Sequence, residues 1–405
     1  MRYKHPTDIP VSKTLFFDWI GDRIPVSSVN VKGDTHPITW ADNDIMYMGT
    51  GDPLWMVRDG VNYAGVASRG FWKESPETYK AMSGQVVEQI TGEPERFQVH
   101  RVHDMPGYTG PGGGGAKPCG MICVDGKLYY AVQNLLGWKT PPNRPNCQHG
   151  SDATIICSED YGKTWTPELN QMFEDFIAEQ YDGEKGTQFS WKTAEGERTG
   201  YRGWKPMFPG SSFGGPSFIQ FGKNNEHAVD SYVYAVSGDQ WDNGTCMRLG
   251  RVPKDSIMDA GAWEFASTDE SNNPAWHKNL ADARPVLEID GHFSIPEMVY
   301  VNSLKKYILL TWALHTDFRS PTGSELTVLE SDMPWGPFSL VYYEWMWYKR
   351  AACPYNPRLP LKWLDQELLE GYILHSGNWE TQTPYYLPQI RKFRFTVRTD
   401  DCRAR

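Results

Sequence analysis

The sequence lacks any run of apolar residues near the roughly 18 that a helix needs to cross a bilayer, which excludes an integral membrane protein. Cysteine is sparse, and its seven residues are too scattered for a disulfide framework and show no zinc pattern. Their odd number leaves at least one free thiol, which favours a reducing compartment. Positive charge is in deficit, because 40 Lys and Arg face 50 Asp and Glu. This balance argues against nucleic acid as the main partner.

The first residues, 1–6, contain no apolar stretch of the kind found in a secretory leader. We therefore expect either a cytoplasmic protein or a secreted or periplasmic one whose signal peptide has been removed. Basic residues gather in 391–398, where they alternate with apolar ones. This alternation predicts an edge strand with one charged face. Nothing in the sequence indicates the oligomeric state.

Turn-forming and aromatic residues are abundant instead. The chain has 38 glycines, 29 prolines, 17 tryptophans, 21 tyrosines and 17 phenylalanines, which favours short strands over long helices. Its length of 405 residues suits one large all-β domain. A degenerate repeat supports this expectation. Five times, a polar segment with a proline leads into an apolar strand, a turn, and a second strand rich in tyrosine or β-branched residues.

The repeat predicts five inner strand pairs. Proline is tolerated at the first residue of a strand, so the prolines at 37, 118, 216, 296 and 357 mark where each inner strand begins. The predicted pairs are 35–40 with 45–48, 117–124 with 127–132, 215–221 with 232–236, 295–300 with 307–312, and 356–363 with 371–375.

Further strand candidates follow each pair, and four strands per unit repeated five times is typical of a β-propeller. We predict an all-β, five-bladed β-propeller with short helical insertions, filling 1–405 as one domain. The predicted blades are 31–105, 110–200, 205–285, 290–348 and 350–400. The expected helices are 75–90 and 166–181, each introduced by a Ser-Pro or Thr-Pro signal, and 182–209 is expected to be a loop that walls a binding site.

Residues 158–165 have the spacing Ser158-x-Asp160-x-Gly162-x-Thr164-Trp165. Aspartate and serine oxygens can accept from the backbone of a turn, glycine permits a positive φ, and tryptophan can pack beneath. The segment resembles an Asp-box, a hairpin motif of sialidases and other carbohydrate-handling propellers. It indicates architecture and says little about the reaction.

In a propeller the inner strands begin around one axis, so residues near the five prolines converge from distant parts of the chain. A polar ligand needs such a gathering of acids, hydroxyls and a cation. The side chains expected there are Asp34, Thr35, His36, Ser217, Ser294, Glu297, Asn356 and Arg358.

Hydrolysis of a glycosidic bond needs a protonated carboxylic acid and a second carboxylate. Asp34 and Asp52 flank the first two strands of unit one and can face one pocket, although each could instead cap a turn. Glu297 is a further catalytic candidate, with a salt bridge to Arg358 as the alternative. Asp239 or Asp242 could supply a third carboxylate.

Four segments, in this order over most of the chain, resemble the five-bladed propeller glycosidases, especially the endo-D-arabinanase-like group. They are Gly33-Asp34-Thr35, Gly51-Asp52, Leu249-Gly250-Arg251-Val252-Pro253 and Trp335-Gly336-Pro337-Phe338. The resemblance implies that Asp34 and Asp52 are paired catalytic aspartates at the propeller mouth. It does not carry over a substrate.

Three functions are consistent with these residues. The first is a glycoside hydrolase acting on a poly- or oligosaccharide, with His36 and Arg358 binding hydroxyls or a uronate and with tryptophans as sugar platforms. The second is a polysaccharide lyase acting on a uronate-containing glycan, and the third is a sugar-binding propeller without catalysis. No cofactor is required, although calcium is compatible with the oxygen ligands expected around the axis. The candidate platforms are Trp204, Trp241, Trp312 and Trp379, and the lyase candidates are His36, His149, Tyr201 and Arg202.

Overall fold

The computed structural model is all-β. It describes residues 2–25, 33–51, 57–58, 61–62, 83–106, 115–136, 149–167, 192–193, 196–197, 206–315, 323–378 and 385–398. Within these residues every helix is a three-residue 3-10 turn, and none is long and apolar enough to cross a membrane. These turns are Pro6–Asp8, Pro94–Arg96, Lys223–Asn225, Lys254–Ser256, Ala260–Ala262, Leu280–Asp282, Arg350–Ala352 and Leu361–Trp363.

The first two sheets are antiparallel and follow one another along the chain. The first sheet contains β3 (Ile38–Trp40), β4 (Met46–Gly51), β7 (Ser83–Thr91) and β8 (Gln98–Pro106). The second contains β9 (Gly115–Val124), β10 (Lys127–Leu136) and β11 (His149–Ser158). Two separate short pairs are β5 (Val57–Arg58) with β6 (Val61–Asn62), and β12 (Lys192–Thr193) with β13 (Gly196–Glu197).

Three further sheets complete the arrangement. The third contains β14 (Pro216–Phe218), β15 (Tyr232–Gly238), β16 (Gly244–Pro253), β19 (Leu287–Phe293) and the parallel β1 (Arg2–Tyr3), with β17 (Glu264–Thr268) and β18 (Pro274–His277) branching from β16. The fourth contains β20 (Glu297–Val301), β21 (Lys306–Leu314), β22 (Ser324–Ser331) and β23 (Ser339–Glu344). The fifth contains β24 (Tyr355–Arg358), β25 (Glu370–Ser376), β26 (Gln389–Val397) and β2 (Leu15–Pro25).

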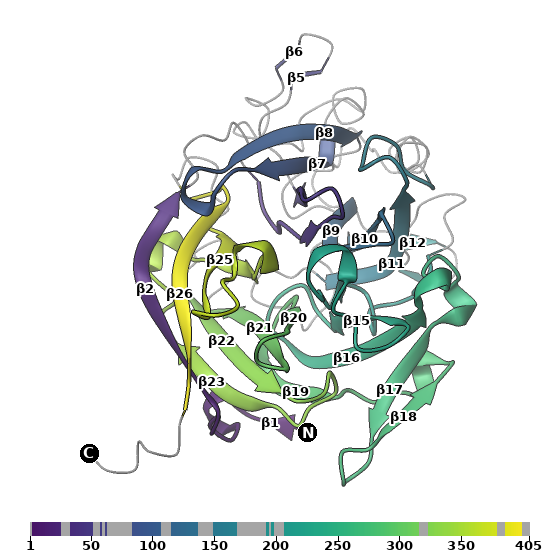
Figure 1. The fold of residues 1–405 in the computed structure, drawn as a ribbon. Helices are drawn as coiled ribbons and strands as arrows, with labels where there is room; N and C mark the ends of the chain where they lie inside the picture. The colour runs from purple at the N-terminus through teal and green to yellow at the C-terminus, as the bar shows by residue number, and fades with distance from the viewer. Residues whose placement is uncertain are drawn as a thin grey trace.

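The sheets follow one another around a common centre in a propeller-like arrangement (Figure 1). The five predicted strand pairs are confirmed as β3–β4, β9–β10, β14–β15, β20–β21 and β24–β25. In each pair the first strand lies at the edge of its sheet, where proline costs no ladder hydrogen bond. The end of the ring at which these inner strands begin is called the mouth below.

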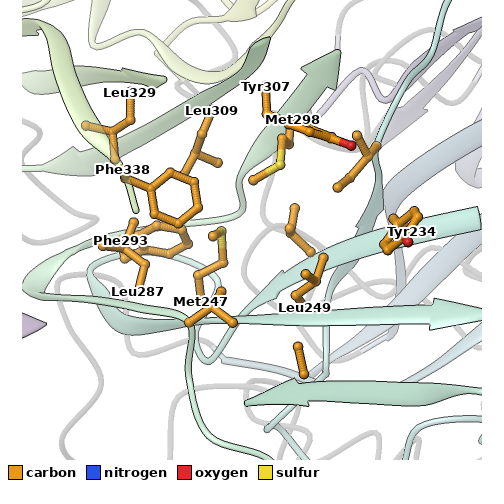
Figure 2. Packing of buried hydrophobic residues seen from close by; sticks show 14 of the residues in the cluster. Tyr234, Met247, Leu249, Leu287, Phe293, Met298, Tyr307, Leu309, Leu329 and Phe338 are labelled. Atoms are coloured by element: carbon orange, nitrogen blue, oxygen red, sulfur yellow. The ribbon is translucent and has the colours of Figure 1, made fainter. Parts of the chain in front are cut away.

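The hydrophobic core lies between neighbouring sheets, as expected for sheets packed face to face. One buried cluster joins the third and fourth sheets. Figure 2 shows Met247 and Leu249 of β16 packed with Met298 and Leu309 of the fourth sheet. Similar clusters join the second sheet to the third and the fourth to the fifth. Another joins the fifth sheet to the first.

The fifth sheet corrects the prediction for 391–398. This segment was expected to be an edge strand, but β26 is an interior strand that pairs with β25 on one side and with β2 on the other. Phe17 and Phe393 stack across β2 and β26, with ring centroids 5.2 Å apart. The fifth unit therefore consists of Leu15–Pro25 as well as the C-terminal strands, and the range 350–400 omits its outer strand.

The helix predicted for 75–90 is wrong over its second half. Ser83–Thr91 forms β7, which lies between β4 and β8. The first half of the predicted helix, 75–82, lies outside the described residues. Val86 and Val87 are fully buried in the sheet, and β-branched residues suit a strand better than a helix. In the second predicted helix, Thr166 pairs with Cys157 as a β-bridge, and 168–181 lies outside the described residues.

Candidate functional site

Arg358 lies where the inner strands converge, and it contacts residues in or just before the inner strand of each of the other four sheets. Its Nε donates to the carbonyl of Thr35 (3.0 Å) and its Nη2 to that of Cys119 (3.3 Å). Its Nη1 donates to Ser217 Oγ (3.3 Å) and Glu297 Oε2 (2.8 Å). We call these five residues the hub cluster. The guanidinium suits this position because it presents five donors in a fixed plane.

Glu297 and Arg358 form a buried ion pair. Their side chains are 3% and 1% exposed, so neither charge is solvated by bulk water. Burial raises the pKa of Glu297, and the nearby Arg358 guanidinium opposes this effect. The ion pair is the alternative to catalysis that the sequence offered for Glu297. The predicted contact of Arg358 with a substrate stays a prediction, since its protein contacts already give it a structural role.

Asp34 lies at the mouth, just before β3, and is 7% exposed. Its Oδ2 accepts hydrogen bonds from the hydroxyls of Tyr355 (2.9 Å) and Tyr386 (3.3 Å). Its backbone exchanges two hydrogen bonds of 2.9 Å with Gly51. A Cβ on Gly51 would come within 2.9 Å of Asp34 Oδ1, so any larger residue at 51 would have to displace the carboxylate. The carboxylate is therefore fixed by two tyrosines from another part of the chain.

The backbone next to Asp34 is strained. Thr35 and His36 have φ values of 66° and 41°, and Asn356 on the neighbouring inner strand has 49°. Non-glycine residues rarely adopt such values, which cost of order 1–3 kcal/mol each and cluster at functional sites. Several fully buried polar atoms around them have no hydrogen-bond partner among the described residues: Thr35 Oγ1, His36 Nε2, Glu297 Oε1 and both amide atoms of Asn356.

A buried polar chain runs outward from His36 into the first sheet. His36 Nδ1 lies 3.2 Å from Thr50 Oγ1, and this hydroxyl donates to Glu88 Oε2 at 2.7 Å. Burial, aided by the Arg358 charge, lowers the pKa of His36 to about 3, so the ring is neutral near pH 7. Burial raises the pKa of Glu88 to about 7. Glu88 is thus a carboxyl group that changes charge near neutral pH.

The rim of the mouth carries an exposed aromatic ring. Trp345 is 57% exposed and stacks on His315, with ring centroids 4.3 Å apart and planes inclined by 19°. His315 directly follows β21, whose Leu310 pairs with Glu297, so the ring lies beyond the hub at the mouth end. A flat exposed ring of this kind can bury the apolar face of a sugar.

Other predicted residues have structural contacts. Asp239 Oδ1 accepts from the backbone N–H groups of Thr245 and Cys246, at 2.9 and 3.1 Å, which closes the turn between β15 and β16. Trp241 is 6% exposed, and Trp312 is 1% exposed with its Nε1 donating to Ile295. Their predicted roles as sugar ligands stay predictions.

Several predicted residues are not placed. Asp52, Tyr201, Arg202, Trp204 and Trp379 lie outside the described residues. His149 begins β11, but its side chain is not among those described. The predicted pairing of Asp34 with Asp52 is therefore not tested.

The turn at 158–165 has the contacts expected from its sequence. Asp160 accepts from the backbone N–H of Thr164 (2.9 Å) and from its hydroxyl (2.7 Å). Ser158 Oγ accepts from the Gly162 N–H at 2.8 Å, and Gly162 has a φ of 87°. Trp165 is 4% exposed and donates to the Gly162 carbonyl. These residues stabilise a hairpin end rather than the mouth.

Sequence reasoning missed five residues of this site: Thr50, Glu88, Trp345, Tyr355 and Tyr386. Tyr355 directly precedes the Asn356-Pro357 marker of an inner strand, so its position at the mouth could have been found. Glu88 was hidden by the wrong helix prediction. Within the described residues, the side chains spaced to hold one metal ion are His5, His292 and Glu325, outside the hub cluster. The compatibility with calcium stays a prediction.

No family model and no curated protein matches the sequence. Among solved structures, a xylan β-1,4-xylosidase from Bacillus halodurans C-125 aligns with a TM-score of 0.48 and 12% identity, over 94% of this chain and 55% of that one. An α-L-arabinofuranosidase from Podospora anserina gives 0.43 and 12%, over 98% and 100%. A β-xylosidase/α-arabinofuranosidase from a compost metagenome gives 0.45 and 11%, over 94% and 96%. Likeness at this level carries no argument about activity.

Proposed function

We propose that this protein is a glycoside hydrolase that cleaves a poly- or oligosaccharide at the mouth of a five-bladed β-propeller. The observation that carries the proposal is Asp34, a nearly buried carboxylate held by two tyrosine hydroxyls at the point where the inner strands converge. The five sheets are the blades, and the contacts of Arg358 with the other four inner strands support this count.

Asp34 acts as the ionised member of the carboxylate pair. Hydrogen bonds donated to a carboxylate favour its charged form, so the hydroxyls of Tyr355 and Tyr386 suit a general base or nucleophile rather than a general acid. The strained backbone at Thr35 and His36 supports the same assignment, because strain of this kind is retained where it positions reacting groups.

Asp52 acts as the proton donor. Gly51, the residue before it, is paired with Asp34 through two backbone hydrogen bonds. This pairing supports a second carboxyl group within reach of the same glycosidic oxygen. Glu297 assists catalysis through the electrostatic field of its ion pair with Arg358. The hub cluster fixes the relative positions of the inner strands at the mouth.

Trp345 provides a platform for a sugar ring at the rim. We also propose that the protein is related to the endo-D-arabinanase-like group and that 158–165 is an Asp-box. Both assignments are consistent with a propeller that handles carbohydrate.

The test is a screen of plant and microbial polysaccharides with product analysis by mass, followed by Asp34→Asn and Asp52→Asn on the best substrate. Each variant should lose about 10³-fold or more in kcat while remaining folded, which urea unfolding checks. Asp255→Asn, at an exposed position, is the control and should keep full activity. Full activity in both test variants would refute the assignment. Products carrying the absorbance of an unsaturated uronate would show a lyase instead, and binding without products would show a sugar-binding protein.

A further inference from the structure

A cluster of metal-ligand side chains lies where the N-terminal segment crosses the third and fourth sheets. It contains His5, His292 of β19 and Glu325 of β22, each of which offers one ligand atom within 4.8 Å of the others. His292 Nδ1 lies 2.6 Å from Glu325 Oε1, and the rings of His5 and His292 meet edge to face with centroids 4.7 Å apart. None of these residues belongs to the hub cluster.

We propose that His5, His292 and Glu325 bind one Zn²⁺ ion. Two imidazole nitrogens and one carboxylate oxygen form a typical zinc donor set, whereas Ca²⁺ and Mg²⁺ prefer oxygen ligands only. Ligands at zinc distances around a tetrahedral ion lie about 3.3 Å apart. The ion would therefore replace the proton between His292 Nδ1 and Glu325 Oε1, and these two atoms would move apart by about 0.7 Å.

The groups around the cluster hold its ligands in place. Glu325 is 1% exposed, and its Oε2 accepts from the Tyr343 hydroxyl at 2.8 Å. His5 Nδ1 lies 2.8 Å from Thr7 Oγ1, so an Nδ1–H can donate there. His5 Nε2, the atom that would ligate, lies 3.2 Å from the Tyr343 hydroxyl, and zinc would replace this contact. The Thr7 backbone N–H lies 3.2 Å from His5 Nδ1 and favours the tautomer that is protonated on Nε2. Zinc bound at Nε2 would instead select the tautomer that is protonated on Nδ1. Such outer contacts orient ligands in metal sites.

The fourth position of the ion is open to water or to His315. The Nε2 of His315 lies 3.5 Å from Glu325 Oε2, and its Nδ1 has no hydrogen-bond partner among the described residues. His292 is 24% exposed, so an ion can enter from solvent. Because His315 also stacks on Trp345, the zinc site would border the rim of the mouth.

The ion would fasten the N-terminal segment to the ring. This segment already pairs through β1 with β19, and the Leu340 N–H donates to the Pro10 carbonyl at 2.8 Å. A metal bond from His5 to His292 and Glu325 would link the segment to two sheets at once. Since the ion binds only the folded arrangement, zinc should raise the melting temperature.

The test is calorimetric titration of the protein, carrying no polyhistidine tag, with ZnSO₄. One equivalent should bind with a Kd of about 10 µM or tighter, and CaCl₂ should give no comparable heat. His5→Ala and His292→Ala should each weaken this binding at least tenfold and remove the zinc-dependent rise in melting temperature. His227→Ala is the matched control, because His227 is exposed and lies 3.7 Å from a glutamate, outside the cluster.

Absence of binding by the parent protein would overturn the proposal, as would unchanged binding in both cluster variants. If His292→Ala fails to fold, His5→Ala decides alone, since His5 lies on the outer N-terminal segment. Substitution with Co²⁺ gives a second readout: the visible bands of a tetrahedral N,O site should appear in the parent and not in His5→Ala. None of these measurements involves a sugar, so their outcome is independent of the proposed hydrolase.

Discussion

The Arg358 guanidinium lies 2.8 Å from the Glu297 carboxylate, and it reaches the carbonyls of Thr35 and Cys119 as well. One side chain thus links strands that are up to 323 residues apart in sequence. Electrostatically, the arginine compensates a buried negative charge and donates to buried backbone carbonyls. The geometry of the mouth therefore depends on a single cation.

Arg358→Met should destabilise the protein by about 3–5 kcal/mol, because it leaves Glu297 as an uncompensated buried charge. The double variant Arg358→Met/Glu297→Gln should recover part of that loss, since the charge is then removed as well. Urea unfolding measures both. Arg394→Met breaks an exposed pair with Glu370 and should cost at most about 1 kcal/mol. An equal loss in the free energy of unfolding for Arg358→Met and Arg394→Met would contradict the central role of the hub cluster.

Glu88 should make stability fall as pH rises. Its pKa is about 7 in the folded protein and near 4.5 when exposed, so the folded state binds the proton more tightly. The associated stability is fully present below pH 4.5 and is lost as pH rises through 7, amounting to about 3 kcal/mol at most. Relative to its own stability at pH 4, Glu88→Gln should therefore lose less than the parent when the pH is raised to 8. Identical pH profiles in urea unfolding would exclude this ionisation.

Tyr355→Phe should shift the acidic limb of the pH–rate profile. The Tyr355 hydroxyl donates to Asp34, and a hydrogen bond to a carboxylate favours its ionised form, so removal of the hydroxyl should move the limb to higher pH. The measurement is kcat/KM against pH on the best substrate. Tyr372→Phe removes a hydroxyl that bonds to Glu95 instead, and should leave the limb in place. If the acidic limb does not move in Tyr355→Phe, then Asp34 is not the group whose ionisation limits kcat/KM at low pH.

Trp345→Ala should raise KM about tenfold with little change in kcat, because an exposed platform contributes about 1–2 kcal/mol to sugar binding. The comparison is steady-state kinetics on oligosaccharides of increasing length. Leu368→Ala, at another exposed apolar position, should leave KM unchanged. A KM that does not change in Trp345→Ala would remove the ring from the substrate path.

The strand pairs could be predicted because each carries its own local signal. Proline before an apolar run marks an inner strand, and the turn at Asp125-Gly126 has the positive φ values that its residues tolerate. The meeting of Thr35, Ser217, Glu297 and Arg358 followed from the repeat, because equivalent positions of repeated sheets lie around one axis.

The rest depends on contacts that local sequence does not encode. β26 looked like an edge strand, since its partner β2 lies more than 360 residues earlier in the chain. The Ser75-Pro76 signal predicts a helix that would include Glu88, whereas the burial of Val86 and Val87 between two strands is a tertiary effect. The tyrosines on Asp34 come from the fifth unit, and no spacing rule connects them with the first.

The pairing of β2 with β26 also has a consequence for how the chain acquires its shape during synthesis. β2 leaves the ribosome long before β26 is synthesised, so β2 stays unpaired with β26 while the first four sheets are completed. Such a long delay between partners predicts slow final assembly and an exposed sheet edge in the nascent chain. A circular permutant, in which a short linker joins β26 to β2 and new termini are opened in a surface loop, should refold faster without a change in the native structure.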